Sequence, residues 1–193
     1  MKGPGPVGLF GGSFNPPHRG HRALVLYAQR RLGLKRVRVL VSPQNPLKSA
    51  GIYDPFAVRL AETRSLMQGL KGVSVEPEAM QGPVFAADTI AQVLDQSKGV
   101  PLIYLIGADS FAGFHRWRHW QTIMESVPIA VISRPGCRLS AMKSPAALRY
   151  ARARIPERQA RSLIDAKAPA WCFLNGLNEP ISSSEIRRHQ NPF

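Results

Sequence analysis

Short runs of apolar residues recur along the chain, and turn-forming or polar residues separate them. Continuous apolar runs of this kind are typical of strands that are covered on both faces of a parallel sheet. The predicted strands are Val7–Phe10, Val37–Val41, Val73–Val75, Leu102–Ile106, Ile129–Ser133 and Trp171–Leu174.

Between these runs, the apolar residues follow the spacing of helices with one buried face. The first predicted helix is Gly20–Leu32, with Gly33 as its C-cap. Asp54 and Asp88 are expected to be N-caps, and Pro55 occupies the first helical position after Asp54. The other predicted helical segments are a helix lined by Phe56, Leu60, Thr63 and Met67, then Asp88–Gln96, Trp120–Ser126, Ala146–Ala166 with a break at Pro156, and Ser182–His189.

The alternation of strands and helices predicts an α/β fold, a Rossmann-like doubly wound and mainly parallel sheet with helices on both faces. A length of 193 residues fits a single domain over residues 1–193. In such sheets ligands bind beyond the carboxyl ends of the strands, near the point where the strand order reverses. We therefore look for a functional site in the loops that follow the strands.

The composition is that of an ordinary globular protein, with 44% hydrophobic and 20% charged residues. The longest apolar runs are too short to span a membrane, and the first residues do not resemble a secretory signal. Two cysteines, Cys137 and Cys172, are too few for a disulfide framework or a four-cysteine zinc site. We therefore expect a reduced, cytoplasmic protein without a membrane partner.

The net charge of +14 is unevenly distributed. Residues 1–53 contain nine basic residues and no carboxylate, and residues 134–167 contain nine more against Glu157 and Asp165. A positive field of this kind attracts nucleotides, polyphosphates or nucleic acid. A solvated basic surface would have the same composition, so charge alone does not identify the partner.

The loop after the first predicted strand carries the clearest chemical signature. Residues 11–21 read Gly-Gly-Ser-Phe-Asn-Pro-Pro-His-Arg-Gly-His. Gly11 and Gly12 permit a tight turn and the close approach of a ligand. His18 and His21 lie where the next helix begins, and the free amides of a helix N-terminus favour an anion. The pattern predicts a phosphate site with two imidazole donors; a metal site is not expected, because no carboxylate or cysteine lies within thirty residues.

This loop resembles the signature of the nucleotidyltransferase superfamily that carries a His-x-Gly-His element. From Val7 to about Arg188 the chain is similar to the bacterial nicotinate-mononucleotide adenylyltransferase family. The resemblance rests on six segments, namely residues 11–21, 43–48, 85–90, 106–111 with Trp117 downstream, 133–136 and 181–187. It implies transfer of the adenylyl group from ATP to nicotinate mononucleotide, which gives nicotinate adenine dinucleotide and pyrophosphate in NAD biosynthesis.

The resemblance also implies roles for individual residues. The expected catalytic residues hold the phosphates of ATP, and they are His18, His21, Lys48, Ser184 and Arg187. The expected ATP-binding residues are Gly11, Gly12, Ser13, Phe14, Asn15, Gly107, Asp109 and Ser183. The expected nicotinate-substrate residues are Phe85, Thr89, Trp117 and Arg134. No protein metal site is expected, because Mg²⁺ would arrive with ATP and keep several waters.

Several of these residues have a structural alternative. Lys48 can be a solvated loop lysine, and Trp117 can belong to the core. Asp109 can accept hydrogen bonds from a ribose or cap the helix that follows it. Arg134 can bind a phosphate monoester or pair with a carboxylate. The three serines 182–184 can bind an anion or form a capping box with Glu185.

The chain also departs from the family pattern. Ser13 and Asn15 replace the usual Thr and Asp, and Ala86 stands where many members have a Thr near the nicotinate. The sequence stops at Phe193, where many relatives continue with another helix.

The residues leave two rival functions open. A sister transferase would use another acceptor, such as nicotinamide mononucleotide or phosphopantetheine. A nucleic-acid-binding protein would use the positive charge, but no recognition module is present and no nucleic-acid partner is expected. The sequence does not predict the oligomeric state.

Overall fold

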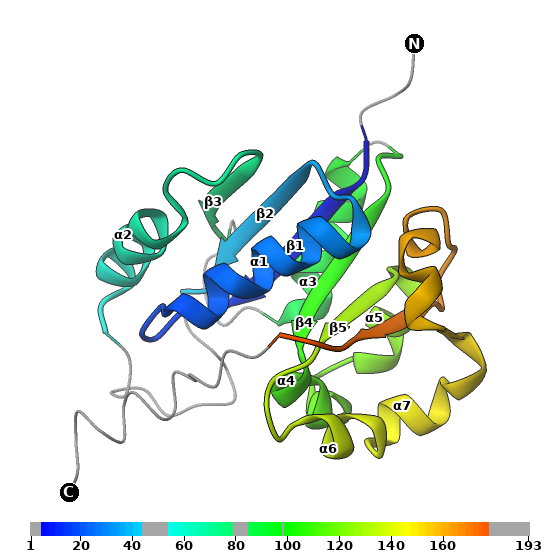
Figure 1. The fold of residues 1–193 in the computed structure, drawn as a ribbon. Coiled ribbons are helices and arrows are strands. Elements are labelled where there is room, and N and C mark those ends of the chain that lie inside the picture. The colour runs from blue at the N-terminus through cyan, green and yellow to red at the C-terminus, as the bar shows by residue number, and fades with distance from the viewer. Residues whose placement is uncertain (1–4, 44–53, 79–84, 98, 178–193) are drawn as a thin grey trace, which may run out of the picture.

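The computed structural model describes residues 5–43, 54–78, 85–97 and 99–177 of the chain (Figure 1). Seven parallel strands form one sheet in the order β3-β2-β1-β4-β5-β7-β6. The strands are β1 (Val7–Gly12), β2 (Arg36–Val41), β3 (Val73–Pro77), β4 (Leu102–Gly107), β5 (Ile129–Ile132), β6 (Arg154–Ile155) and β7 (Trp171–Leu174). The predicted doubly wound α/β fold is therefore confirmed.

The order of the strands reverses between β1 and β4. From β1 the chain adds β2 and β3 on one side, whereas β4, β5 and β7 follow on the other. β1 pairs with β2 over six residues but with β4 over only three, from Val7 opposite Leu102 to Leu9 opposite Tyr104. The two strands thus separate toward their carboxyl ends, which is where a ligand site is expected in this fold.

Helices cover both faces of the sheet (Figure 1). The helices are α1 (Arg19–Leu32), α2 (Phe56–Met67), α3 (Ala86–Gln96), α4 (Ala108–Ala112), α5 (Trp120–Ser126), α6 (Arg138–Met142) and α7 (Pro145–Arg149), with 3₁₀ turns η1 (Phe114–Arg116), η2 (Ala151–Ala153) and η3 (Glu157–Ile164). Residues of α1, α2 and η3 pack on one face, and residues of α3 to α7 pack on the other. Among the described residues, no helix is long and apolar enough to cross a membrane.

Burial explains why the central strands are apolar throughout. All residues of β4 and β5 are buried. Ile103 and Leu105 face the cluster that contains α1, while Tyr104 and Ile106 face the cluster that contains α3 and α4. Because both faces of these strands are covered, the sequence shows continuous hydrophobic runs instead of alternation.

Two predicted helix caps are wrong. α2 begins at Phe56 with Pro55 at the N-cap position, so Asp54 lies outside the helix. α3 begins at Ala86 with Phe85 at its N-cap position, and Asp88 lies in the first turn. Neither helix has a side-chain cap hydrogen bond.

The buried face of α2 also differs from the prediction. Arg59, Thr63 and Met67 are buried, whereas Phe56 and Leu60 are only partly buried. The helix is rotated relative to the predicted face so that an arginine points inward. The reason is a set of carbonyl groups that this arginine binds, described below.

The predicted helix over 146–166 is broken into short pieces. The segment Arg154–Ile155 instead forms strand β6, with Arg154 opposite Trp171 and Ile155 opposite Cys172. The indole Nε1 of Trp171 donates to the carbonyl of Tyr150 at 2.8 Å, just after α7 ends. Pairing with β7 therefore overrides the helical propensity of this Ala- and Arg-rich segment. The helix predicted at Ser182–His189 lies outside the described residues.

Candidate active site

Two histidines begin helix α1 and hold its first turn. His18 is the N-cap, and its Nδ1 accepts a hydrogen bond from the amide of Gly20 at 3.1 Å. His21 lies three residues on, and its Nδ1 accepts from the amide of His18 at 3.1 Å. The two imidazole rings lie 3.8 Å apart between centroids. Imidazoles here make the reciprocal pair of bonds that Ser and Glu usually make in a capping box.

These backbone bonds determine the tautomer of both rings. In a neutral imidazole one nitrogen accepts and the other carries the proton. Since Nδ1 accepts in both His18 and His21, Nε2 carries the proton in both neutral rings. The site therefore contains two imidazole N–H donors beside the amides of a helix N-terminus, an arrangement suited to phosphate.

His21 stays neutral because of its surroundings. Burial lowers the pKa of the imidazole well below its ordinary value, and the neighbouring His18 and Arg134 lower that pKa further. At neutral pH the ring is consequently a hydrogen-bond donor through Nε2 instead of a cation.

The lowered pKa of His21 makes stability depend on pH. Below pH 6.5 the unfolded chain takes up a proton at this position that the folded chain does not, so the free energy of unfolding should fall as pH drops further. For each pH unit, we expect the free energy of unfolding of wild type to fall by up to about 1.4 kcal/mol more than that of His21→Gln. Glutamine is chosen because it keeps a hydrogen-bond acceptor at this capping position. Denaturant unfolding at pH 7.5, 6.5 and 5.5 measures this, and equal losses in both chains would exclude His21 as the group.

A second pair of polar residues lies after β4 and β5. Nη1 of Arg134 is 3.5 Å from Oδ2 of Asp109, and the side chains are 9% and 40% exposed. A Cβ on Gly107 would lie 2.4 Å from Oδ1 of Asp109, so glycine leaves the room that this carboxylate occupies. Asp109 is in the first turn of α4 and does not cap it. Of the two alternatives for Arg134, the ion pair with a carboxylate is present; its binding of substrate phosphate stays a prediction.

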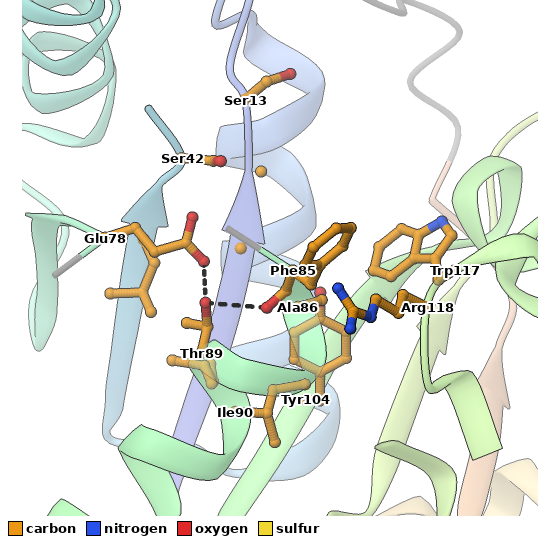
Figure 2. Close-up of a pocket in the computed structure, with 14 residues that line it drawn as sticks. Ser13, Ser42, Glu78, Phe85, Ala86, Thr89, Ile90, Tyr104, Trp117 and Arg118 are labelled. Atoms are coloured by element: carbon orange, nitrogen blue, oxygen red, sulfur yellow. Dashed lines mark hydrogen bonds between the residues drawn. The ribbon is translucent and has the colours of Figure 1, made fainter. Parts of the chain in front are cut away.

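A pocket lies between β1 and the start of α3 (Figure 2). Six predicted site residues line it, namely Gly11, Gly12, Ser13, Phe85, Thr89 and Trp117. The other lining residues are Leu9, Leu40, Ser42, Glu78, Ala86, Ile90, Tyr104 and Arg118. The fold thus brings the glycine turn together with the predicted nicotinate residues, which are far apart in sequence.

One end of the pocket is polar and carries a carboxylate (Figure 2). The hydroxyl of Thr89 donates to Glu78 and is 3.4 Å from the carbonyl of Phe85. Burial raises the pKa of Glu78, and the hydrogen bonds from Thr89 and Ser42 lower it in part. Sequence reasoning missed Glu78 and Ser42, although each directly follows a strand and the rule for this fold would have found them.

The other end of the pocket is aromatic and basic. Trp117 is partly buried, and its ring lies 5.2 Å from that of Phe114. The guanidinium of Arg118 lies 4.8 Å from the centre of the Phe85 ring. A flat ring therefore has an indole to stack on at this end.

Two of the predicted ATP-binding side chains support the loop from within. Phe14 is 2% exposed, and its ring lies 4.8 Å from His21 and against Gly12. Asn15 is also buried, and its Oδ1 accepts from the amide of Asp54 at 2.9 Å. Contact between these residues and ATP stays a prediction. Lys48, Ser183, Ser184 and Arg187 lie outside the described residues.

A buried arginine that sequence reasoning missed ties the loops together. Arg59 of α2 is 1% exposed and donates to four backbone carbonyls. The acceptors are Asp54 at 2.9 Å, Ser13 at 2.5 Å, Ser42 at 2.8 Å and Pro43 at 2.5 Å. One side chain thus connects the loop after β1, the loop after β2 and the start of α2.

The fold and the paired histidines together define a nucleotidyltransferase-like site, and comparison with known proteins agrees. The sequence model of the family described as cytidylyltransferase-like matches residues 9–189, so the chain belongs to that family. The chain is 50% identical over 181 residues to a protein of Cereibacter sphaeroides named probable nicotinate-nucleotide adenylyltransferase, covering 94% of this chain and 95% of the relative. A protein of Caulobacter sp. with the same name is 47% identical to this chain, and the match covers 95% of this chain and 97% of the relative. Within the family, the chain therefore belongs with the probable nicotinate-nucleotide adenylyltransferases.

Solved structures support the same fold at low sequence identity. The nicotinic acid mononucleotide adenylyltransferase of Plasmodium falciparum, complexed with NaAD, matches with a TM-score of 0.71 and 16% identity. The match covers 96% of this chain and 83% of that one. A second structure of that protein, complexed with APC, matches with a TM-score of 0.66.

Proposed function

We propose that the protein transfers the adenylyl group of ATP to nicotinate mononucleotide, which gives nicotinate adenine dinucleotide and pyrophosphate. The observation that carries the proposal is the imidazole pair of His18 and His21. Both neutral rings carry a proton on Nε2 at the N-terminus of α1, and Gly11, Gly12 and Ser13 before them line the pocket that contains Trp117. The names of relatives that are 47–50% identical to this chain support the same reaction.

The reaction is a displacement at phosphorus. A phosphate oxygen of the mononucleotide bonds to the α-phosphorus of ATP, and the bond from that phosphorus to the bridging oxygen breaks as pyrophosphate leaves. The attacking phosphate is already ionised, so no strong general base is required. Positioning and neutralisation of charge are then the main contributions that the protein makes.

His18 and His21 are suited to the α-phosphate. Their Nε2 protons would donate to its nonbridging oxygens as negative charge builds, and the amides that begin α1 would add to this field. The lowered pKa of His21 keeps a neutral donor in place, so substrate binding does not require deprotonation of the ring.

The nicotinate ring fits the pocket between Phe85 and Trp117. Trp117 offers an indole face for stacking, and Thr89 offers a hydroxyl that already contacts Glu78. Ala86 lines the same pocket with a methyl group, which neither donates nor accepts a hydrogen bond. Of the pocket-lining side chains at the start of α3, Thr89 would therefore make the polar contact with the substrate.

The nucleoside of ATP would lie nearer the residues that follow β4. Asp109 can accept hydrogen bonds from ribose hydroxyls, and Gly107 leaves room for its carboxylate. Arg134, which pairs with Asp109, would also bind a phosphate through its guanidinium group. Lys48, Ser183, Ser184 and Arg187 are proposed for the triphosphate on the basis of the sequence motifs alone.

The described residues contain no group of three or more His, Cys, Asp and Glu side chains that could hold a metal ion. This donor set fits a magnesium ion that arrives on the triphosphate and keeps several waters, instead of one held in a protein cage. When bound, such an ion neutralises charge on the phosphate oxygens. In this proposal the histidines act directly on the α-phosphate.

An acceptor assay tests the proposed function. The purified protein is incubated with ATP and one of three acceptors, nicotinate mononucleotide, nicotinamide mononucleotide or phosphopantetheine, and pyrophosphate release is measured. We expect the highest kcat/KM with nicotinate mononucleotide, and chromatography should identify nicotinate adenine dinucleotide as the product. A higher kcat/KM with either other acceptor would favour a sister transferase.

A further inference from the structure

The pocket has one charge of each sign, at opposite ends. Among the described residues that line it, Arg118 is the cation and Glu78 is the carboxylate. Figure 2 shows the two side chains on opposite sides, with Phe85 and Tyr104 between them and Trp117 next to Arg118. A ligand stacked on Trp117 would therefore have a guanidinium at one edge and a carboxylate beyond the other.

Two contacts hold Arg118 at the rim. Its guanidinium lies 4.8 Å from the centre of the Phe85 ring, within the range of a cation–π contact. Its Nε donates to Nε2 of His119 at 3.2 Å. Neither Nη1 nor Nη2 of Arg118 donates a hydrogen bond in these two contacts.

No carboxylate in the described part of the chain neutralises Arg118. The ion pairs between described residues are Arg31–Glu157, Arg38–Glu76 and Arg134–Asp109. A positive charge that is positioned over an aromatic ring, and that no described acid neutralises, suits an anionic group on a ligand.

We propose that Arg118 is a specificity-determining residue that binds the ring carboxylate of the pyridine mononucleotide. The inference rests on the proposed function and assigns the group that distinguishes nicotinate from nicotinamide. A planar carboxylate accepts two parallel hydrogen bonds from a guanidinium. The amide of nicotinamide has one acceptor oxygen and an NH₂ group, which would present donors to the donors of Arg118.

Glu78 adds to the discrimination from the other end. If the nicotinate carboxylate pointed toward Glu78, two negative charges would meet in a partly buried place, or one of them would have to take up a proton. Either outcome is unfavourable for binding. The two charged residues thus favour one direction of the nicotinate ring on Trp117, with its carboxylate toward Arg118. Stacking on Trp117 is similar for both pyridine rings, so the discrimination comes from the edge of the ring.

The test compares two acceptors in wild type and in Arg118→Gln. We expect the variant to lose about 10- to 100-fold in kcat/KM for nicotinate mononucleotide, the range for loss of a hydrogen bond to a charged group. For nicotinamide mononucleotide we expect a change of less than about threefold, because the lost bonds were not made to the amide. KM for ATP should stay the same. Arg118→Lys should retain part of the preference, because it keeps the charge without the fork.

Arg116→Gln is the matched control. Arg116 is exposed, lies two residues away and does not line the pocket, yet its replacement removes the same charge. This variant should keep the preference for nicotinate mononucleotide, which separates a local contact from a general loss of positive field. Thermal melting of all three variants verifies that they fold.

The outcomes separate the two proposals. If wild type prefers nicotinate mononucleotide and Arg118→Gln retains that preference, the role of Arg118 is refuted while the proposed function stands. If Arg116→Gln loses the preference as fully as Arg118→Gln, the local contact is likewise refuted. If wild type forms no dinucleotide from either mononucleotide, the proposed function fails and the role of Arg118 fails with it.

Discussion

Replacement of His18 by alanine should lower kcat by about 100-fold or more, because it removes a donor that is expected to act on the charge of the transition state. His18 is also the N-cap of α1, so the same substitution should cost about 1 kcal/mol of stability. Single-turnover measurement of adenylyl transfer, with the free energy of unfolding measured in parallel, separates the two effects.

His18→Asn makes the separation sharper. Asparagine is a strong N-cap and would accept the Gly20 amide in place of the imidazole Nδ1. It lacks the Nε2 donor, so we expect near wild-type stability together with the same large loss of kcat. If kcat recovered in His18→Asn, the histidine would serve only to begin the helix, and its proposed role at phosphorus would be refuted.

Replacement of Arg59 by methionine should lower the free energy of unfolding by about 3 kcal/mol or more. The side chain is buried and donates to four carbonyls in two loops and at the start of α2, and methionine would leave those acceptors without these donors. Chemical denaturation measures the loss. Because the carbonyls of Ser13 and Ser42 belong to residues of the pocket, kcat/KM should fall as well.

Two further variants test the cause. Arg59→Lys keeps the charge but cannot reach four acceptors with one ammonium group, so an intermediate loss is expected. Arg64→Met removes a charge from an exposed position of the same helix and should change stability by less than about 0.5 kcal/mol. Similar losses in Arg59→Met and Arg64→Met would contradict the bracing role of Arg59.

The parts of the fold that depend on local pattern could be predicted from the sequence. Trp171–Leu174 and Trp120–Ser126 have the predicted bounds, and α1 ends at the predicted Gly33, whose φ of 71° is one that glycine adopts without strain. The histidine pair was also found where the next helix begins. In each case the signal is contained in a few neighbouring residues.

The parts that depend on distant partners could not be predicted. Arg59 resembles any surface arginine on a helix, and only the loops from β1 and β2 make its burial favourable. Arg154–Ile155 is a strand because β7 lies beside it, although its neighbours favour a helix. Arg118 belongs to none of the motifs in the sequence, and its contact with Phe85 joins residues more than thirty positions apart.

The short pairing between β1 and β4 has a mechanical consequence. Three residue pairs join the two halves of the sheet at this seam, against six between β1 and β2. A nucleotide that touches the loop after β1 on one side and the residues after β4 on the other would bridge this seam where the two strands are no longer paired. The bound nucleotide would then both take part in catalysis and stabilise the association of the two halves of the sheet.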